Sequence, residues 1–151
     1  MSTTVDTSPV RPLIRPAGPT DADRVYALLE QLATSYSPER PAFDANFPRL
    51  LNDESTSLLL VAEDATGVVV GYALTTITPL LHTNGSSAHL QELVVDDAHR
   101  SRGVGTAIVE EVERVCRERS VRQITVASRR SADFYERIGY RSSADFLKRS
   151  F

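Results

Sequence analysis

Hydrophobic residues follow two different periods along the chain, and this predicts a mixture of strands and helices. Continuous or alternating apolar residues at 57–63, 68–77 and 88–95 are typical of strands. Residues 22–32 and 103–118 instead carry apolar side chains every three or four positions, as one face of a helix does. The longest predicted elements are therefore three successive strands with one helix before them and one after.

Shorter patterns complete the order of elements. The chain predicts a disordered tail at 1–9, an edge strand at 10–15, a weaker helix at 43–51, a loop at 78–87, a strand at 121–127, a helix at 131–138 and one or two short strands within 140–151. Pro48 interrupts the weaker helix, and Gly139 ends the last one. The order β-α-α-β-β-β-α-β-α-β predicts an α/β (α+β) fold, in which one mixed sheet has helices on both faces.

Length and composition indicate one ordinary domain, which we expect to span residues 10–151. The chain has 151 residues, of which 41% are hydrophobic and 25% charged, so it can form a core without a disulfide or a metal ion. Cys116 is the only cysteine, which excludes an intrachain disulfide and fits a cytoplasmic location. No apolar run approaches the ~20 residues of a membrane helix, and residues 1–9 lack the features of a secretory signal. We therefore expect no membrane partner.

Charge is unevenly distributed along the chain. The formal net charge is −3, but residues 1–99 hold 5 basic and 13 acidic residues, whereas residues 100–151 hold 12 basic and 7 acidic ones. Such asymmetry indicates either a bound anion or a chance surface patch. The arginines of the second half are spread over several elements without an aromatic stacking platform, so nucleic acid is not an expected partner.

The sign of the charge changes at a glycine-containing loop with the sequence RSRGVGT, residues 100–106. The loop follows a predicted strand and precedes the longest helix, whose first N–H groups lack partners and whose dipole favours an anion. Glycines there let the backbone approach a phosphate closely. Ile108 stands where a dinucleotide-binding fingerprint needs a third glycine, and the sole lysine, Lys148, lies far from any Walker A position. The pattern predicts a phosphate site of another kind.

Two motifs resemble signatures of one family. The segment RSRGVG at 100–105 resembles the Gln/Arg-x-x-Gly-x-Gly/Ala signature of the GCN5-related N-acetyltransferase (GNAT) superfamily, and ELVVD at 92–96 is similar to the strand that leads into it. About thirty residues later, ADFYERIGY at 132–140 resembles the family's closing Phe-Tyr-x-x-x-Gly-Phe/Tyr block. The resemblance covers nearly the whole chain from residue 10 onward. It implies a mostly antiparallel sheet in which two strands splay apart to admit coenzyme A.

The activity that the resemblance implies is transfer of an acyl group from acetyl-CoA to a primary amine, without a metal. The residues that it implies for coenzyme binding are Leu93, Val94 and Val95 on the strand, Arg100, Arg102, Gly103, Val104, Gly105 and Thr106 on the loop, and Ser128 and Ser131 further along. Relatives often carry Asn and Ala where this chain has Ser128 and Ser131. The same loop would also serve a non-catalytic acyl-CoA-binding module.

Amine acylation needs a base that keeps the amine neutral, N–H groups that hold the thioester carbonyl, and an acid for the leaving thiolate. Tyr135 matches the acid of similar enzymes, or packs behind Phe134. His89 and Glu92 are the candidate bases, with a base acting through water as a third option. Strict alternation puts His89, Gln91 and Leu93 on one face and Glu92 on the other, unless a bulge intervenes.

The acceptor is not specified by any motif. The fold that the resemblance implies would build its site from residues 26–51 and 80–87. Acidic residues in the first half slightly favour a cationic amine. Family resemblance alone implies a homodimer.

Overall fold

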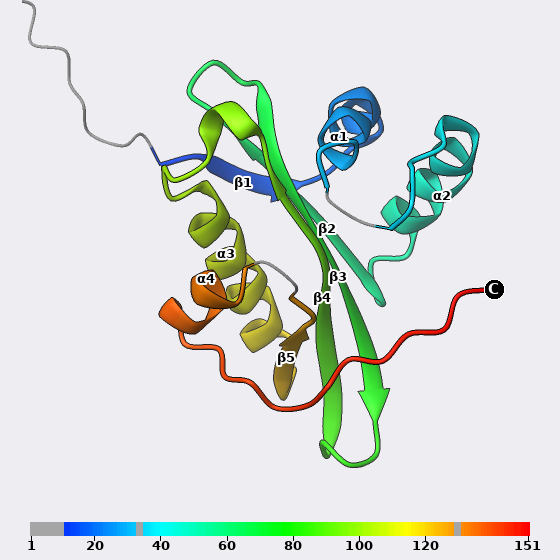
Figure 1. Ribbon diagram of the computed structural model, residues 1–151, viewed down its shortest axis with the longest axis vertical. Coiled ribbons are helices and arrows are strands. Elements are labelled where there is room, and N and C mark those ends of the chain that lie inside the picture. Colours follow the sequence, from blue (N-terminus) through cyan, green and yellow to red (C-terminus); the bar gives the residue numbers. More distant parts are fainter. Residues whose placement is uncertain (1–10, 33–34, 129–130) are drawn as a thin grey trace, which may run out of the picture.

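The computed structural model describes residues 11–32, 35–128 and 131–151 and contains one five-stranded sheet (Figure 1). The strands in chain order are β1 (Leu13–Pro16), β2 (Ser57–Glu63), β3 (Val69–Leu80), β4 (Gly85–Val95) and β5 (Gln123–Val126). They lie in this same order across the sheet, and only the β4–β5 pair is parallel. The expected α/β (α+β) class and the mostly antiparallel sheet are thus confirmed. The tail expected at 1–9 lies outside the described residues.

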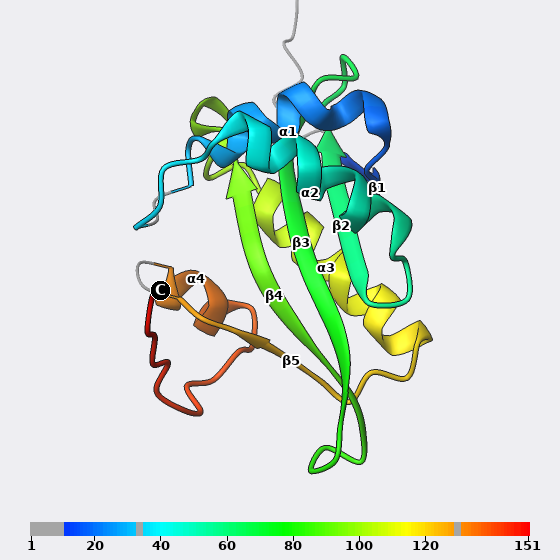
Figure 2. The same ribbon diagram turned by 90° about the vertical axis from the view of Figure 1, so that its right-hand side faces the viewer.

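Helices cover both faces of the sheet, as the order of elements predicted. The helices α1 (Ala22–Leu29) and α2 (Arg40–Asn52) lie on one face, and α3 (Val104–Glu118) and α4 (Ala132–Arg137) lie on the other (Figures 1 and 2). Two short 3-10 turns, Pro19–Asp21 and Asp97–His99, precede α1 and follow β4. The molecule is therefore a three-layer arrangement with the sheet in the middle.

Each face of the sheet has its own apolar core, because alternate residues of a strand point to opposite sides. In β2, Leu58 and Leu60 pack with Ile108 and Val112 of α3. Leu59 of the same strand packs instead with the cluster that includes Val25, Leu28 and Phe47 of α1 and α2. A strand buried on both faces reads as a continuous apolar run, which is the pattern at 57–63.

The structure corrects three of the expected elements. Residues 78–87 are not a loop: β3 continues to Leu80 and β4 begins at Gly85, so only a four-residue turn separates them. The helix α2 begins at Arg40, because a proline in the first turn of a helix removes no hydrogen bond. Among the described residues after Tyr140 there is no strand. The tail instead runs to the α1–α2 loop, where Lys148 Nζ donates to Ser35 Oγ at 2.6 Å.

Candidate active site

The loop between β4 and α3 has the backbone geometry of an anion site. Gly103 caps α3 with φ +84°, and Ser101 also has a positive φ of +63°. Neighbouring left-handed and right-handed residues turn successive N–H groups to the same side, which forms an anion-binding concavity. Within the described chain, no group accepts a hydrogen bond from the N–H groups of Val104, Gly105 and Thr106, the first turn of α3. The predicted phosphate site therefore has free donors.

The two arginines of this loop differ in their surroundings. The guanidinium of Arg100 pairs with Asp97 at 2.7 Å and donates to the carbonyl of Val95 at 3.2 Å, so part of its donor capacity is used to hold the loop. Arg102 is exposed, and no group in the described ranges pairs with it. Arg102 is thus the side chain of the loop whose positive charge is uncompensated.

A compact turn fixes the start of the loop. The carboxylate of Asp96 accepts from the N–H of Ala98 at 3.2 Å, and this hydrogen bond lowers the pKa of Asp96. The imidazole of His99 lies 3.9 Å from Asp96 and 3.9 Å from Asp64 in the β2–β3 turn. The loop is therefore tied to a neighbouring hairpin before it reaches the glycines.

One residue that supports this site was not found from the sequence. A Cβ atom on Gly71 of β3 would lie 3.0 Å from the carbonyl oxygen of Val94 and 3.1 Å from Ile108 Cδ1 of α3. The absence of a side chain thus lets the first turns of α3 rest directly on the sheet. Gly71 is an isolated glycine inside an apolar strand pattern, and such a glycine often marks a close approach of another element. This feature of the sequence could have indicated the position.

A β-bulge lies in the middle of β4. Leu74 of β3 pairs with Glu92, but the next residue, Thr75, pairs with Leu90, so no residue of β3 is paired with Gln91 in the ladder. The side chain of Gln91 donates to Thr76 Oγ1 at 3.0 Å. His89 pairs with Thr76, two residues from Leu74, and paired residues share a face of the sheet. His89 and Glu92 therefore lie on the same face, the one covered by α1 and α2. The prediction from strict alternation, which separated them, is wrong because the bulge adds one residue.

The bulge coincides with the place where β4 and β5 part. The parallel pairing runs from Ser87–Gln123 to Leu90–Val126 and stops there. Beyond Leu90, β5 turns away toward α4 while β4 continues straight to the loop (Figure 2). Among the described residues, the backbone of β4 from Gln91 to Val94 consequently has a free edge, as the expected splayed strand pair requires, and the carbonyl of Val95 beyond it accepts from Arg100. Leu93 and Val95 pack on the α3 side of this segment, whereas Val94 is buried on the opposite side.

The two candidate bases have different partners. His89 Nδ1 lies 2.7 Å from Thr125 Oγ1 of β5, and its ring stacks on Phe146 of the tail with centroids 6.4 Å apart. Burial lowers the pKa of His89. Glu92 accepts a hydrogen bond at 2.7 Å from the hydroxyl of Tyr72 and lies just past the point where β4 and β5 part. Both side chains lie on the face covered by α1 and α2, but only Glu92 lies in the part of β4 that has a free edge.

Tyr135 lies on the other side of the sheet from both candidate bases. Its side chain is 8% exposed and belongs to the core cluster beneath α3, in edge contact with Phe134 and Tyr140. Burial raises the pKa of Tyr135 to about 12, so its hydroxyl keeps its proton at neutral pH. Phe134 in turn lies next to Gly105, where a Cβ would be 3.5 Å from the ring. The FYERIG block thus contacts the glycine loop directly.

Ser128 and Ser131 lie together at the start of α4. The hydroxyl of Ser128 accepts from the N–H of Ser131 at 3.0 Å, and both residues are exposed. The Ser128 side chain therefore has a local structural task at the position where relatives often carry Asn.

Other features of the described residues do not change this picture. Two pockets, of about 270 Å³ between β1 and α3 and about 410 Å³ between α1 and α2, contain none of the loop residues. No cluster of metal-ligating side chains occurs in the described ranges. None of the helices in the described part of the chain has the length and apolar character needed to span a bilayer.

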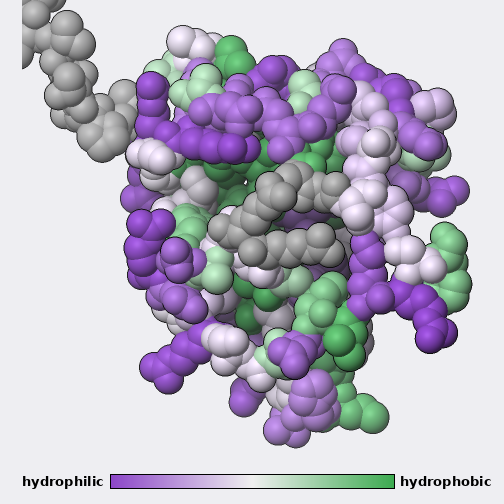
Figure 3. All heavy atoms as spheres, in the orientation of Figure 1, coloured by the Kyte–Doolittle hydropathy of each residue, from purple (hydrophilic) through white to green (hydrophobic). Residues whose placement is uncertain are grey.

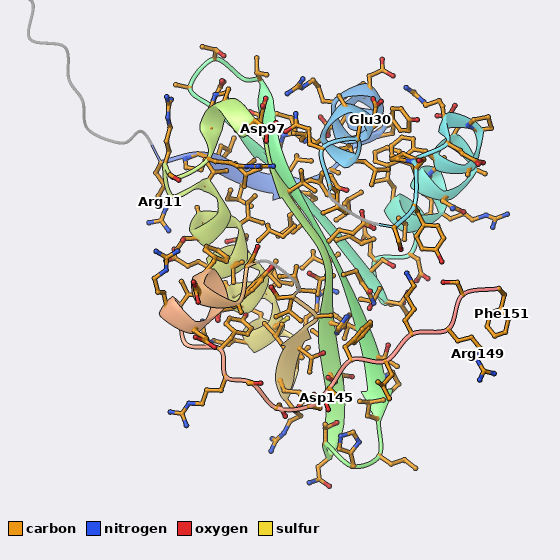
Figure 4. All side chains as sticks on the ribbon, viewed as in Figure 1. Arg11, Glu30, Asp97, Asp145, Arg149 and Phe151 are labelled. Carbon is orange, nitrogen blue, oxygen red and sulfur yellow. The ribbon has the colours of Figure 1, made fainter. Side chains whose placement is uncertain are left out.

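The segment expected to complete the acceptor site from the β3–β4 side lies elsewhere. Residues 80–87 are at the far end of the long strands, opposite to α1 and α2, in both views (Figures 1 and 2). The tail takes the position near the α1–α2 loop, where Tyr36 donates to Ser150 at 3.3 Å. Arg149 and Phe151 lie at its end, on the side of α2 (Figure 4).

A glycine loop with free N–H groups at a helix start, beside two strands that part half-way, is the arrangement that the resemblance implied for acyltransferases that use acyl-CoA. Comparison with known proteins agrees. Residues 22–140 match the Acetyltransferase (GNAT) family, and the chain belongs to this family.

One relative supports the same assignment, and two solved structures share the fold. Glucosamine 6-phosphate N-acetyltransferase 1 of Oryza sativa subsp. japonica is 31% identical over 131 residues, which cover 84% of this chain and 79% of the relative. The structure is similar to that of glucosamine-6-phosphate N-acetyltransferase from Arabidopsis thaliana, with a TM-score of 0.81, 22% identity and coverage of 94% and 99% of the two chains. It is also similar to a transcriptional regulator from Bacillus halodurans C-125, with a TM-score of 0.85, 24% identity and coverage of 93% and 100%. The protein is an acetyl-CoA-dependent N-acetyltransferase that acts on an amine.

Proposed function

We propose that the enzyme acetylates a small primary amine by direct transfer and that Glu92 is the general base. The observation that carries this proposal is the bulge at Gln91, which puts Glu92 on the face of α1 and α2 immediately beyond the last β4–β5 pair, Leu90–Val126. A carboxylate at this point can accept the proton of an amine that approaches from the α1–α2 side.

The coenzyme would bind in the gap between β4 and β5 on the side opposite to α1 and α2. The N–H groups of Val104, Gly105 and Thr106 and the guanidinium of Arg102 would hold its pyrophosphate. The strand segment Leu93–Val95, which among the described residues has no pairing partner in β5, would lie beside its pantetheine arm. When bound, acetyl-CoA supplies an acetyl group activated as a thioester. The N–H groups of β4 just past the bulge are available to hold the carbonyl oxygen as it gains charge.

Tyr135 is the proposed general acid. Its pKa of about 12, raised by burial, keeps it protonated and able to donate a proton to a thiolate at neutral pH. His89 is the alternative base, and its lowered pKa keeps the imidazole neutral. However, its Nδ1 contacts Thr125 and its ring stacks on Phe146. His89 also lies where β4 and β5 are still paired. These contacts favour Glu92.

The acceptor that we propose to test first is glucosamine 6-phosphate, because this is the substrate in the names of two similar proteins. The tail carries Lys148, whose contacts among the described residues are the hydroxyl of Ser35 and the ring of Tyr36, at 2.6 and 4.9 Å. A cation held by neutral groups near the α1–α2 loop suits a phosphate. A cationic amine is the competing acceptor, since Glu30 lies at the end of α1 (Figure 4).

The decisive experiment is release of coenzyme A from acetyl-CoA across a panel of amines. The panel contains glucosamine 6-phosphate, glucosamine, spermidine and a peptide with a free N-terminus. Glu92→Gln should lower kcat/KM by about 10²–10⁴-fold with any accepted amine, whereas His89→Gln should change it by less than about tenfold. Equal losses in both variants, or none in Glu92→Gln, would refute the assignment of the base. Turnover with none of the amines would refute a small amine acceptor.

Assembly and location complete the proposal. We propose that residues 10–151 act as one cytoplasmic N-acetyltransferase domain that forms a homodimer. Apolar spheres gather at the lower end of the face seen in Figure 3, and Leu81, Phe146 and Leu147 are 98%, 71% and 89% exposed. Apolar residues that gather on a surface commonly mark an interaction site, and this supports the proposed dimer. Light scattering after gel filtration should give twice the chain mass of 16.6 kDa, and a single-chain mass would refute the dimer.

A further inference from the structure

We propose that Tyr72 is a positioning residue that fixes the Glu92 carboxylate for proton transfer. Tyr72 lies in β3 and is 2% exposed, and its hydroxyl donates to Glu92 Oε1 at 2.7 Å. The inference rests on the proposed role of Glu92 and adds a second residue to it. No sequence motif pointed to Tyr72.

The ring of Tyr72 is held on all sides, which makes its hydroxyl a fixed point. It belongs to the core cluster beneath α1 and α2, with Val25, Leu28 and Val61 among its members. In the sheet it pairs with Val94, while Glu92 pairs with Leu74 two residues further along β3. The two side chains are therefore diagonal neighbours on one face, and a long aromatic side chain reaches such a neighbour.

The hydroxyl remains a donor throughout the working range of pH. Burial, with a further contribution from the charge of Glu92, raises the pKa of Tyr72 far above its ordinary value. Among the described groups, Glu92 is the only charged side chain that acts on this hydroxyl. The basic residue of α1, Arg24, instead donates to the carbonyl of Val69 and to the carboxylate of Asp96.

This hydrogen bond has two consequences for the base. It occupies Oε1 and stops rotation of the carboxylate, so Oε2 is left to accept the proton of the amine. It is also a firm restraint on the carboxylate, because hydrogen bonds to a charged group are among the stronger ones in proteins. In the reaction, the amine N–H bond breaks as its proton passes to Oε2, while the nitrogen forms the new bond to the acetyl carbon and the carbon–sulfur bond breaks.

The test is the variant Tyr72→Phe, compared with Thr75→Val as a matched control. Thr75 is a 0% exposed residue of the same strand on the opposite face, and its hydroxyl has no hydrogen-bond partner among the described residues. In Tyr72→Phe we expect kcat to fall about tenfold, the size of one hydrogen bond to a charged group. The KM for acetyl-CoA should remain within a factor of about two, because the loop donors are unaffected.

Further variants separate a failure of this inference from a failure of the base assignment. If Glu92→Gln is inactive and adding Tyr72→Phe to it causes no further loss, the tyrosine acts through the carboxylate. If Glu92→Gln is as active as the wild type, the proposed base is wrong. If Glu92→Gln is inactive but Tyr72→Phe keeps a wild-type kcat, the positioning role is refuted. Should Tyr72→Phe unfold, 3,5-difluorotyrosine at position 72, a stronger donor of similar size, should change kcat and leave the KM for acetyl-CoA within about twofold, and an unchanged kcat would overturn the inference.

Discussion

The two glycines of the coenzyme loop should respond in opposite ways to the same substitution. Gly103 has φ +84° with no atom within 4 Å of a would-be Cβ, so an alanine there meets no neighbour but adopts a left-handed conformation. This conformation costs an alanine about 1–2 kcal/mol. Gly105 is helical, and its would-be Cβ lies 3.5 Å from Phe134 and 3.7 Å from Val95, which are ordinary contact distances. An alanine there gains about 0.5–1 kcal/mol from helix propensity and from a less flexible unfolded chain.

These energies predict the direction of both stability and coenzyme affinity. Gly103→Ala should lower Tm by about 2–8 °C, since about 1 kcal/mol corresponds to ~2–4 °C for a chain of this size. To relieve the strain, the loop would turn its N–H groups away from the phosphate position, and the loss of about two hydrogen bonds would raise the KM for acetyl-CoA about tenfold. Gly105→Ala should raise Tm by about 1–4 °C and leave the KM within about twofold, in agreement with a signature that admits Ala at this position.

Thermal unfolding and a thiol-release assay measure the two effects separately. Cys116, the only cysteine, is 3% exposed, and burial raises the pKa of its thiol, so it reacts little with the thiol reagent. The reasoning would be refuted if Gly105→Ala raised the KM as much as Gly103→Ala, because the added methyl group would then occupy space that the coenzyme needs. An unchanged Tm in Gly103→Ala would show that the left-handed conformation is not required.

Three further perturbations have definite expected outcomes. Gly71→Ala should destabilise the fold by about 1–3 kcal/mol in urea unfolding, because its methyl group overpacks against α3 and a carbonyl. It should also raise the KM for acetyl-CoA. A wild-type midpoint of urea unfolding would contradict the close approach of α3 to β3 at Gly71. The hydrogen bond from Arg15 lowers the pKa of Asp21, so this pair stabilises the fold fully above about pH 5 and loses its effect as pH falls below about 4. Asp21→Asn should accordingly flatten the acid side of a Tm–pH curve, and an unchanged curve would argue against the pair. Deletion of Gln91 removes the bulge and should let β4–β5 pairing continue past its present end. Calorimetry should then show that acetyl-CoA binding is lost, while the Tm is retained. The control is Gln91→Ala, which keeps the bulge and should bind acetyl-CoA normally.

The order of elements could be predicted because each long element buries a face with its own period. Residues 103–118 show the helical spacing that in the structure places Ile108 and Val112 on the sheet, and this also located the phosphate loop before it. The β3–β4 hairpin was harder, since polar and proline residues at 78–87 resemble a loop although Pro79 pairs with Ser86. The path of the tail was not predictable either, because its contacts to Ser35 and Tyr36 join residues more than a hundred positions apart.

The choice of base depends on the bulge, and the sequence indicates the bulge by a one-residue shift in the apolar alternation of β4. Ala88 and Leu90 face α3 at a spacing of two, and the same face then continues at Leu93 and Val95, so the alternation slips by one residue between them. A regular strand would bury either Ala88 and Leu90 or Leu93 and Val95 on that face, but not both pairs. Burying a Leu or Val side chain contributes about 1.5–3 kcal/mol, which is more than the one ladder hydrogen bond that a bulge gives up. The slip is hidden because β4 is buried on both faces at this point, so Val94 fills the gap in the pattern with another apolar residue. Where a strand is buried on both sides, a change of phase in the apolar spacing is therefore better evidence for a bulge than any break in hydrophobicity, and here it moves the carboxylate of Glu92 onto the face where an amine can reach it.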